Sequence, residues 1–338
     1  MIKYIFANRI LRNTLLLLLP ILCIFLTLFV GRYPLSFLQV MGVLLPGVGF
    51  PEPTYEVHTI VWQMRLPRAI MGTFVGAALA VSGAAFQGVF RNPLVNSGIL
   101  GVTNGAGFGA ALAIIVFGGG LYTYGLSFTF AVMAVVLAYF AGRFYGSAPS
   151  VTLVLGGVVI SSFFSALTSI LRYIADPYSQ LPAITYWFMG SLANANYSQF
   201  IAFIPMTVGM AMIYLSRWRI NALSMGEKEA TALGVNTGFY KLMIIGGATL
   251  TTASAVCVSG GIGWVGLVIP HIGRMLVGND NTKLIPLSMS LGACFLVLID
   301  VLSRTLSSSE IPIGILTSLI GTPFFVYLLK KTKGGGWK

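Results

Sequence analysis

Residues 65–109 read RLPRAIMGTFVGAALAVSGAAFQGVFRNPLVNSGILGVTNGAGFG, and this stretch decides the kind of fold that the chain adopts. Within its long apolar run, small residues recur at every fourth position: Gly72, Gly76, Ala80, Ala84 and Gly88. Because residues i and i+4 lie on one face of an α-helix, these five form a smooth stripe. In lipid, such stripes allow two helix backbones to approach closely. The stretch therefore predicts a membrane-spanning helix that packs tightly against a neighbour.

The predicted helix ends at Asn92 and Pro93, since proline lacks a backbone N–H and restricts the conformation of the residue before it. A second small-residue stripe follows at Gly101, Gly105 and Gly109. The stretch as a whole predicts two closely packed helices joined by a short break.

The composition is that of a polytopic membrane protein. The chain has 338 residues, of which 57% are hydrophobic and 8% are charged, whereas a soluble domain carries about 25% charged residues. Its mean hydropathy is +0.89. The net charge of +12 does not indicate nucleic-acid binding, because the basic residues are scattered singly between apolar runs. We therefore expect an all-α membrane protein with a single transmembrane domain over residues 1–338.

Ten runs are apolar enough and long enough to cross a bilayer, at about 20 residues per crossing. They cover residues 13–31, 67–89, 96–117, 124–142, 151–172, 197–215, 239–257, 262–277, 284–303 and 311–329. An even number of crossings places both termini on one side of the membrane. With a cytoplasmic N-terminus, fifteen Lys and Arg residues fall on the inner side and five on the outer side. The positive-inside rule therefore predicts that both termini are cytoplasmic.

Two polar segments are longer than simple turns. The inner segment 216–238 contains good helix formers over Glu227–Leu233, followed by Gly234 as a stop, and predicts a short helix beneath the membrane. The outer segment 32–62 contains four prolines and predicts a loop with a short helix over Tyr55–Met64. Ser309 and Pro312 predict the start of the last helix, as N-cap and first-turn residues.

A faint internal echo relates residues 76–83, GAALAVSG, to residues 247–254, GATLTTAS. The two runs cross the membrane in opposite directions, and each precedes a break that contains proline. This arrangement is typical of an inverted repeat, as found in many transporters.

The sequence lacks the motifs of several kinds of active site. It has no Walker A pattern, so we expect no ATP site on this chain. Its two histidines lie far apart, and its three cysteines are isolated in apolar runs, which argues against a metal site or a membrane-embedded enzyme. Asp300 is the one acidic residue clearly inside a predicted span, which disfavours an ion-coupled secondary carrier without removing it as an alternative.

Three outer arginines stand out. Arg65 and Arg68 lie one turn apart at the mouth of the second span, and Arg304 lies at the outer end of the ninth. Each could snorkel toward lipid phosphates, and Arg304 could pair with Asp300 four residues before it. Together, on the side that is poor in basic residues, they suggest a docking surface for acidic groups of a partner. Arg172, at the outer end of the fifth span, could snorkel or attract an anionic substrate.

Several motifs, in a preserved order, resemble the FecCD-type permeases of type II ABC importers, which take up cobalamin, haem and iron–siderophores. They are RLPR at 65–68, GAALAVSGAAFQGVFRNPL at 76–94, LGVTNGAG at 100–107, GLVIPHIGRML at 266–276 and EIPIG at 310–314. The resemblance implies a homodimer of ten-helix subunits in the bacterial or archaeal cytoplasmic membrane. It also implies two partner ATPase subunits that carry ATP and Mg, and an extracytoplasmic binding protein that delivers the substrate.

The resemblance further implies roles for particular residues. Arg65, Arg68 and Arg304 would meet glutamates of the binding protein. The ATPase coupling segment would include Gly226, Glu227, Ala230, Leu233 and Gly234. The inner gate loops would include Asn92, Pro93, Ser147 and Ser150. The substrate stays open among metal chelates and, in a minority of the family, oxyanions such as molybdate. Candidate pathway residues in the fifth span are Ser161, Ser162, Phe163, Ser165, Thr168, Ser169 and Arg172.

Overall fold

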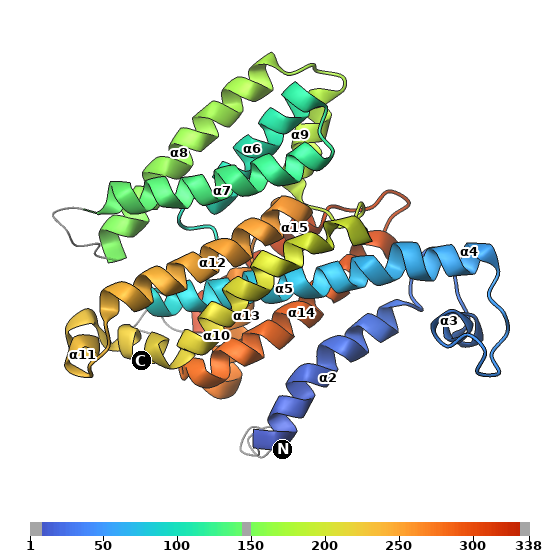
Figure 1. Cartoon of the computed structure of the whole chain (residues 1–338), viewed down its shortest axis with the longest axis horizontal. Coiled ribbons are helices and arrows are strands. Elements are labelled where there is room, and N and C mark those ends of the chain that lie inside the picture. Colours follow the sequence, from blue (N-terminus) through green and yellow to red (C-terminus); the bar gives the residue numbers. More distant parts are fainter. Residues whose placement is uncertain (1–8, 144–149, 332–338) are drawn as a thin grey trace.

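The structure, a computed structural model, describes residues 9–143 and 150–331, and its regular elements there are all helices (Figure 1). They are α2 (Arg9–Thr27), α3 (Phe37–Leu44), α4 (Tyr55–His58), the π-helix η1 (Thr59–Arg65), α5 (Leu66–Val89), α6 (Val102–Phe117), α7 (Leu121–Gly142), α8 (Ser150–Ile174), α9 (Gln180–Met189), the 3-10 helix η2 (Tyr197–Ala202), α10 (Phe203–Met225), α11 (Glu227–Ala232), α12 (Thr237–Ser259), α13 (Val265–Val277), α14 (Asn281–Thr305) and α15 (Ile313–Lys331).

Helix α5 is the element around which the others pack. It contacts α10, α12, α13 and α14, and nearly all of its residues are buried. Helices α6, α7, α8 and α9 form a second group, which joins the first through α12. Figure 1 shows this second group above α12, with α2 at the opposite edge, where it packs on α14. The fold is thus a helical bundle with one central spanning helix.

The small-residue stripe on α5 brings helix backbones into contact, as the sequence predicted. Within the predicted stripe, a Cβ atom at Gly76 would overlap the backbone of Gly292 on α14, and one at Gly88 would overlap the Ile220 side chain on α10. Gly83, which is not part of the predicted stripe, makes a similar close contact with the backbone of Gly266 on α13. In the second stripe, Gly105 and Gly109 pack in the same way against α7. Gly101 does not belong to that stripe, because it is the N-cap of α6 and has a φ of +89°, which glycine adopts without strain.

Each of the ten predicted apolar runs overlaps a helix of the described chain. Among the residues that the structure describes, six helices are long and apolar enough to cross a membrane, and four apolar helices are shorter. The chain is therefore a multi-pass membrane protein, and the total of ten crossings stays a prediction. The two segments of the proposed inverted repeat touch in the core, where the Thr252 hydroxyl donates to Ser82 Oγ at 2.9 Å.

The outer segment 32–62 is more ordered than its prolines suggested. The predicted helix over Tyr55–Met64 is present as α4 and η1, which run directly into α5. Helix α3 was not predicted. It begins with a capping box, in which Ser36 accepts from the Gln39 backbone and the Gln39 side chain accepts from the Ser36 N–H. The spacing of Ser36 and Gln39 was a usable signal for this helix.

The contact between α5 and α14 gives a first test. We expect Gly76→Ala to destabilise the protein by about 1–3 kcal/mol, because the added methyl group must push two helix backbones apart. Thermal unfolding in detergent measures the loss. The control is Gly125→Ala on α7, where nothing lies within 4 Å of a new Cβ atom. Equal melting temperatures for the two variants would contradict the role of the stripe.

Candidate functional site

The three outer arginines lie together, as expected of a shared surface, but their side chains are buried inside the chain. Their exposed fractions are 5% for Arg65, 8% for Arg68 and 8% for Arg304. All three line a cavity of about 370 Å³ at the N-terminal end of α5 and the C-terminal end of α14. Arg32 and Glu310 line the same cavity. We call these five residues the outer arginine cluster.

Arg68 is the centre of a buried ion network. Its Nε atom donates to Asp300 at 2.7 Å, and its Nη1 atom lies 2.9 Å from Glu310. The predicted pair of Arg304 with Asp300 is present but long, at 3.8 Å, so Arg68 is the main partner of Asp300. Because these groups come from α5, α14 and the segment before α15, the network ties the outer ends of three helices together.

The prediction that Ser309 caps the last helix is wrong. Helix α15 begins at Ile313, and Glu310 lies outside it with its carboxylate on Arg68. The position of this segment is thus set by the ion pair between Glu310 and Arg68, and not by a helix cap at Ser309. Sequence analysis treated Glu310 as part of a helix start and so did not predict its ion pair with Arg68.

The cluster retains excess positive charge. Among the residues that the structure describes, Arg32, Arg65, Arg68 and Arg304 lie near two carboxylates, those of Asp300 and Glu310. Arg65 donates to the backbone carbonyls of Leu28 at 2.7 Å and Tyr33 at 2.5 Å, and has no carboxylate partner in the described chain. Arg32 is exposed, and its Nε atom donates to the carbonyl of Arg304 at 3.0 Å.

Two guanidinium N–H groups in this cluster also lack an acceptor. The Nη2 atom of Arg68 and the Nε atom of Arg304 are buried without a hydrogen-bond partner among the described residues. Buried donors normally have partners. Both atoms are covered by the chain itself, so the excess positive charge is the feature of the cluster that an acidic group from outside would meet.

The predicted short helix within the segment 216–238 is present as α11. Glycines with positive φ angles flank it, +141° at Gly226 and +76° at Gly234. Ala230 is fully buried in this chain, so it anchors α11 and is not a surface contact. Leu233 is 57% exposed. Glu227 forms an ion pair of 2.5 Å with Lys241 on α12, which holds the helix against the bundle.

A polar clamp links the residues just before α11 to the start of α14. The Asn221 side chain on α10 donates to Asp280 at 2.9 Å and accepts from the Asn281 backbone at 2.8 Å. Partial burial opposes ionisation of Asp280, but hydrogen bonds from Thr282 and Asn221 hold its pKa below the usual value. Asp280 is therefore charged at neutral pH. Sequence analysis did not find this clamp, because its members are 59 residues apart.

The predicted gate loop after α5 is tightly held. The Asn92 side chain accepts from the Leu94 N–H at 2.9 Å and so shapes the turn around Pro93. Gln87, near the end of α5, donates to the Val95 carbonyl at 3.0 Å and accepts from Arg274 on α13. The other predicted gate loop lies mostly outside the described residues, including Ser147. Ser150 is described, and its hydroxyl donates to the Val89 carbonyl at 3.5 Å.

The candidate pathway residues on α8 do not all share one face. Four of them line an open cavity of about 630 Å³, together with Asn96 and Asn104; they are Ser161, Ser162, Ser165 and Ser169. Phe163 is exposed but does not line this cavity. Thr168 is buried and does not line this cavity, and its hydroxyl donates to the Phe164 carbonyl at 2.8 Å. The guanidinium of Arg172 lies 4.3 Å from the centre of the Phe188 ring, a cation–π contact.

No group of three or more His, Cys, Asp or Glu side chains that could hold a metal ion occurs within residues 9–143 and 150–331. The described geometry thus combines a charged outer cluster, a polar cavity along α8 and a short helix beneath the bundle.

A model of the FecCD transport family matches residues 17–331. The chain belongs to the FecCD transport family.

Individual relatives agree with this assignment. The permease protein MolB of a molybdate import system in Haemophilus influenzae is 42% identical over 95% of this chain and 96% of its own length. A probable iron chelatin transport system permease from Helicobacter pylori is 40% identical over 84% of this chain and 86% of its own length. A solved structure, described as an inward-facing conformation of a metal-chelate type ABC transporter, has a TM-score of 0.81 and 41% identity, and covers 94% of this chain and 97% of its own.

The FecCD protein described here is therefore a membrane-spanning permease subunit of an ABC transporter. Its all-helical fold is that of this family. It is a transport subunit of that system.

The buried ion network gives a second test. Arg68→Met leaves Asp300 buried without its main partner, so we expect a loss of about 3–5 kcal/mol in stability. The double variant Arg68→Met with Asp300→Leu removes both charges, and its melting temperature in detergent should recover most of the loss. Lys283→Met is the control, because its ion pair with Asp280 is exposed and long, at 3.9 Å. A single variant as stable as the control would overturn the assignment of this network.

Proposed function

We propose that this FecCD protein forms, as a homodimer, the membrane pathway of an ATP-driven importer, with molybdate as the first candidate substrate and an iron chelate as the second. The observation that carries the substrate proposal is the cavity along α8. Serine hydroxyls and asparagine amides line it, and its described lining includes no carboxylate. Such groups donate hydrogen bonds to the oxygens of an oxyanion without adding charge repulsion.

The names of the relatives support both candidates. The Haemophilus influenzae permease is named for molybdate, and the Helicobacter pylori permease is named for iron chelatin. The serine-lined cavity suits a small, oxygen-rich anion, and an iron chelate would require the second subunit to enlarge the same space. In this proposal both termini are cytoplasmic, ATP and Mg bind only to partner ATPase subunits, and the chain itself holds no cofactor.

On the outer face, we assign the outer arginine cluster to docking of an extracytoplasmic binding protein. Arg65, Arg68 and Arg304 form the floor of the cavity, and exposed Arg32 lies at its edge. The excess positive charge of the cluster favours an acidic side chain of the partner. Electrostatic attraction of this kind speeds association and fixes orientation.

On the inner face, we assign α11 to coupling with the ATPase subunits. Leu233 and Met225 are exposed at its two ends, with exposed fractions of 57% and 63%, and offer an apolar contact. Because the polar clamp joins Asn221 on α10 to the start of α14, a displacement of α11 would move both helices as a unit. Gln87 would carry the same movement to the loop at Asn92 and Pro93.

ATPase stimulation of the reconstituted complex tests the proposed function. The cognate binding protein is titrated in its free form and loaded with molybdate, a ferric siderophore, haem or cobalamin. We expect stimulation by one loaded form, with molybdate as the first expectation. If no ATPase subunit co-purifies and no cargo stimulates hydrolysis, the importer proposal fails and an ATPase-independent secondary carrier becomes the better explanation.

The docking assignment predicts the effect of reversing one exposed charge. Arg32→Glu should weaken binding of the loaded binding protein by about tenfold or more at low salt, and less at high salt, because added ions screen the attraction. Biolayer interferometry at two ionic strengths measures this, and basal ATPase activity should be unchanged. The control is Arg217→Glu, which changes the net charge of the protein by the same amount as Arg32→Glu but lies on the proposed inner side. It should bind the loaded binding protein with normal affinity. Equal affinities for the two variants would contradict docking at this cluster.

The coupling assignment predicts that Leu233→Asp releases the ATPase subunits. Leu233 is exposed, so the substitution should leave the melting temperature of the permease nearly unchanged while placing a charge in an apolar contact. Co-purification of the ATPase subunits measures the effect. The conservative variant Leu233→Met should retain them. Intact co-purification of Leu233→Asp would count against α11 as the coupling helix.

A further inference from the structure

Arg172 lies on the same face of α8 as the serines that line the cavity along this helix. Ser161, Ser165 and Ser169 are part of that lining. An α-helix turns by about 100° per residue, so Arg172 leaves the helix axis in a direction between those of Ser161 and Ser165, about one turn beyond Ser169. In the orientation predicted from charge, Arg172 therefore continues the row of hydroxyls toward the outer side of the membrane.

The opposite face of α8 at this level is apolar. Ile170 and Ile174 each lie two residues from Arg172, which places them about 160° away around the helix. Their exposed fractions are 58% and 62%, whereas Arg172 is only partly exposed. The side chain of Arg172 therefore leaves α8 on the side away from this exposed apolar face, which argues against the alternative that it snorkels toward lipid phosphates.

The guanidinium of Arg172 is held by a ring from another helix. Its central carbon lies 4.3 Å from the centre of the Phe188 ring on α9. A glycine on α6 makes room for that ring, because a Cβ atom at Gly107 would overlap Phe188. A guanidinium that stacks on an aromatic ring by its face keeps the N–H groups at its edge available as a planar fork. Residues from three helices thus fix the guanidinium without using its N–H groups.

The N–H groups of Arg172 have no acceptor in the described chain. Among the described residues, its guanidinium forms no hydrogen bond and no ion pair with a carboxylate. Its Nε atom is buried, but its two Nη atoms are not. Asp176 is the nearest acidic residue in the sequence, and its carboxylate accepts from Ser179 and from the Tyr178 backbone instead. The positive charge of Arg172 is therefore uncompensated, and its accessible donors are free.

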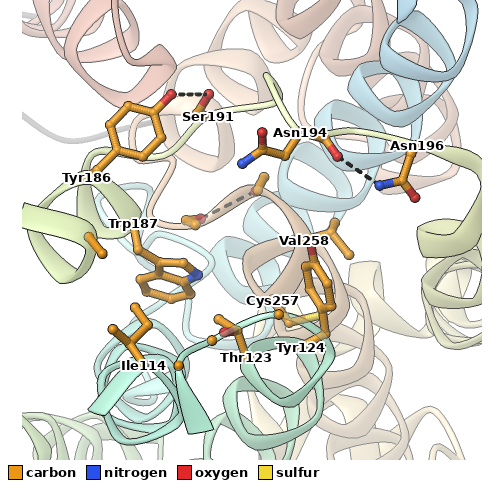
Figure 2. A pocket seen from close by; sticks show the side chains of 16 residues that line it. Ile114, Thr123, Tyr124, Tyr186, Trp187, Ser191, Asn194, Asn196, Cys257 and Val258 are labelled. Carbon is orange, nitrogen blue, oxygen red and sulfur yellow. Dashed lines mark hydrogen bonds between the residues drawn. The ribbon is translucent and has the colours of Figure 1, made fainter. Parts of the chain in front are cut away.

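The other polar cavity at α9 offers no such charge. Figure 2 shows this cavity, which has a volume of about 450 Å³ and is lined by Tyr186, Trp187, Ser191 and Asn194 among others. The Tyr186 hydroxyl donates to Ser191 at 3.0 Å. The described lining of the cavity includes no charged side chain. Consecutive residues of α9 thus serve two different places, since Trp187 lines the neutral cavity and Phe188 holds Arg172.

We propose that Arg172 determines the charge of the solute that this permease accepts. Its two free Nη groups donate parallel hydrogen bonds to two oxygens of an anionic group, which is either an oxyanion such as molybdate or a carboxylate of an iron chelate. The serine hydroxyls of α8 donate to the remaining oxygens. A neutral solute gains nothing from this arrangement. The proposal rests on the proposed function, because it takes the cavity along α8 as the transport pathway.

Equilibrium dialysis of the purified full-length permease tests the site without transport. The protein is dialysed against molybdate and, separately, against citrate as a carboxylate probe. Arg172→Met should weaken binding of the favoured anion by about tenfold or more, because charge-assisted hydrogen bonds are lost. Arg172→Lys keeps the charge without the planar fork and should recover part of the affinity. The control is Arg217→Met on α10, which also removes a cation–π contact and should bind normally.

The outcomes of the dialysis are distinct. Wild-type affinity in Arg172→Met would overturn the assignment, and so would the absence of binding of both anions to the wild-type protein. Loss of binding in Arg172→Met alone supports the assignment, and the anion that binds more tightly identifies the recognised group as an oxyanion or a carboxylate.

A second variant tests the positioning role of the ring. Phe188→Leu leaves Arg172 in place but removes the stacking surface, and should weaken anion binding by about two- to fivefold, the contribution of a cation–π contact. Its melting temperature in detergent, compared with that of the wild type, shows whether the fold is kept. Unchanged anion affinity in Phe188→Leu would contradict the positioning of the guanidinium by this ring.

Uptake measurements separate this inference from the proposed function. In proteoliposomes with the ATPase subunits and the loaded binding protein, Arg172→Met should take up about tenfold less solute per ATP hydrolysed. The loaded binding protein should still stimulate hydrolysis, because the outer arginine cluster is intact. If the wild type and Arg172→Met import equally, this inference alone fails. If the wild type binds the anion in dialysis but imports nothing, the importer proposal fails and the assignment of Arg172 as an anion site stands.

Discussion

The close approach of helix backbones around α5 is the constraint on which the rest of the structure depends. At Gly76 the backbone of α14 occupies the space of a side chain, and at Gly83 the backbone of α13 does so. Apolar side chains gain little from meeting one another in lipid, so contact between closely fitted surfaces must hold the helices together. A central helix made of small residues satisfies this requirement against α10, α12, α13 and α14 at once. The other elements are placed relative to this central group.

Polar contacts are concentrated at the two ends of α5. At its outer end, Arg68 joins Asp300 and Glu310, and at its inner end, Gln87 joins Val95 and Arg274. The first set fixes the segment before α15, and the second fixes the loop that contains Asn92 and Pro93. A helix with rigid connections at each end is suited to transmit movement between the two sides of a membrane. This is the mechanical basis of the importer that we propose.

Charge placement in the sequence grouped Arg65, Arg68 and Arg304 correctly, and all three line one cavity. The grouping was possible because the start of one spanning helix and the end of a helix of opposite direction lie on the same side of the membrane. It did not identify their intramolecular partners. Glu310 follows Arg68 by 242 residues, and Arg32 reaches Arg304 across 272 residues. Thr168 and Ala230 illustrate the same difficulty, since a helical pattern gives the residues that share a face but not the face that is covered.

The sequence by itself determined the all-helical class, the positions of the long apolar helices, the close packing of the small-residue stripes and the short inner helix α11. These follow from local periodicity and composition, which act within one or two turns of a helix. Only the tertiary structure decided that Arg65, Arg68 and Arg304 are buried around one cavity, that Arg68 and Arg304 share Asp300 and that four serines of α8 share another cavity. Each of these depends on which distant helices become neighbours, and backbone contact between helices, not local propensity, makes that choice.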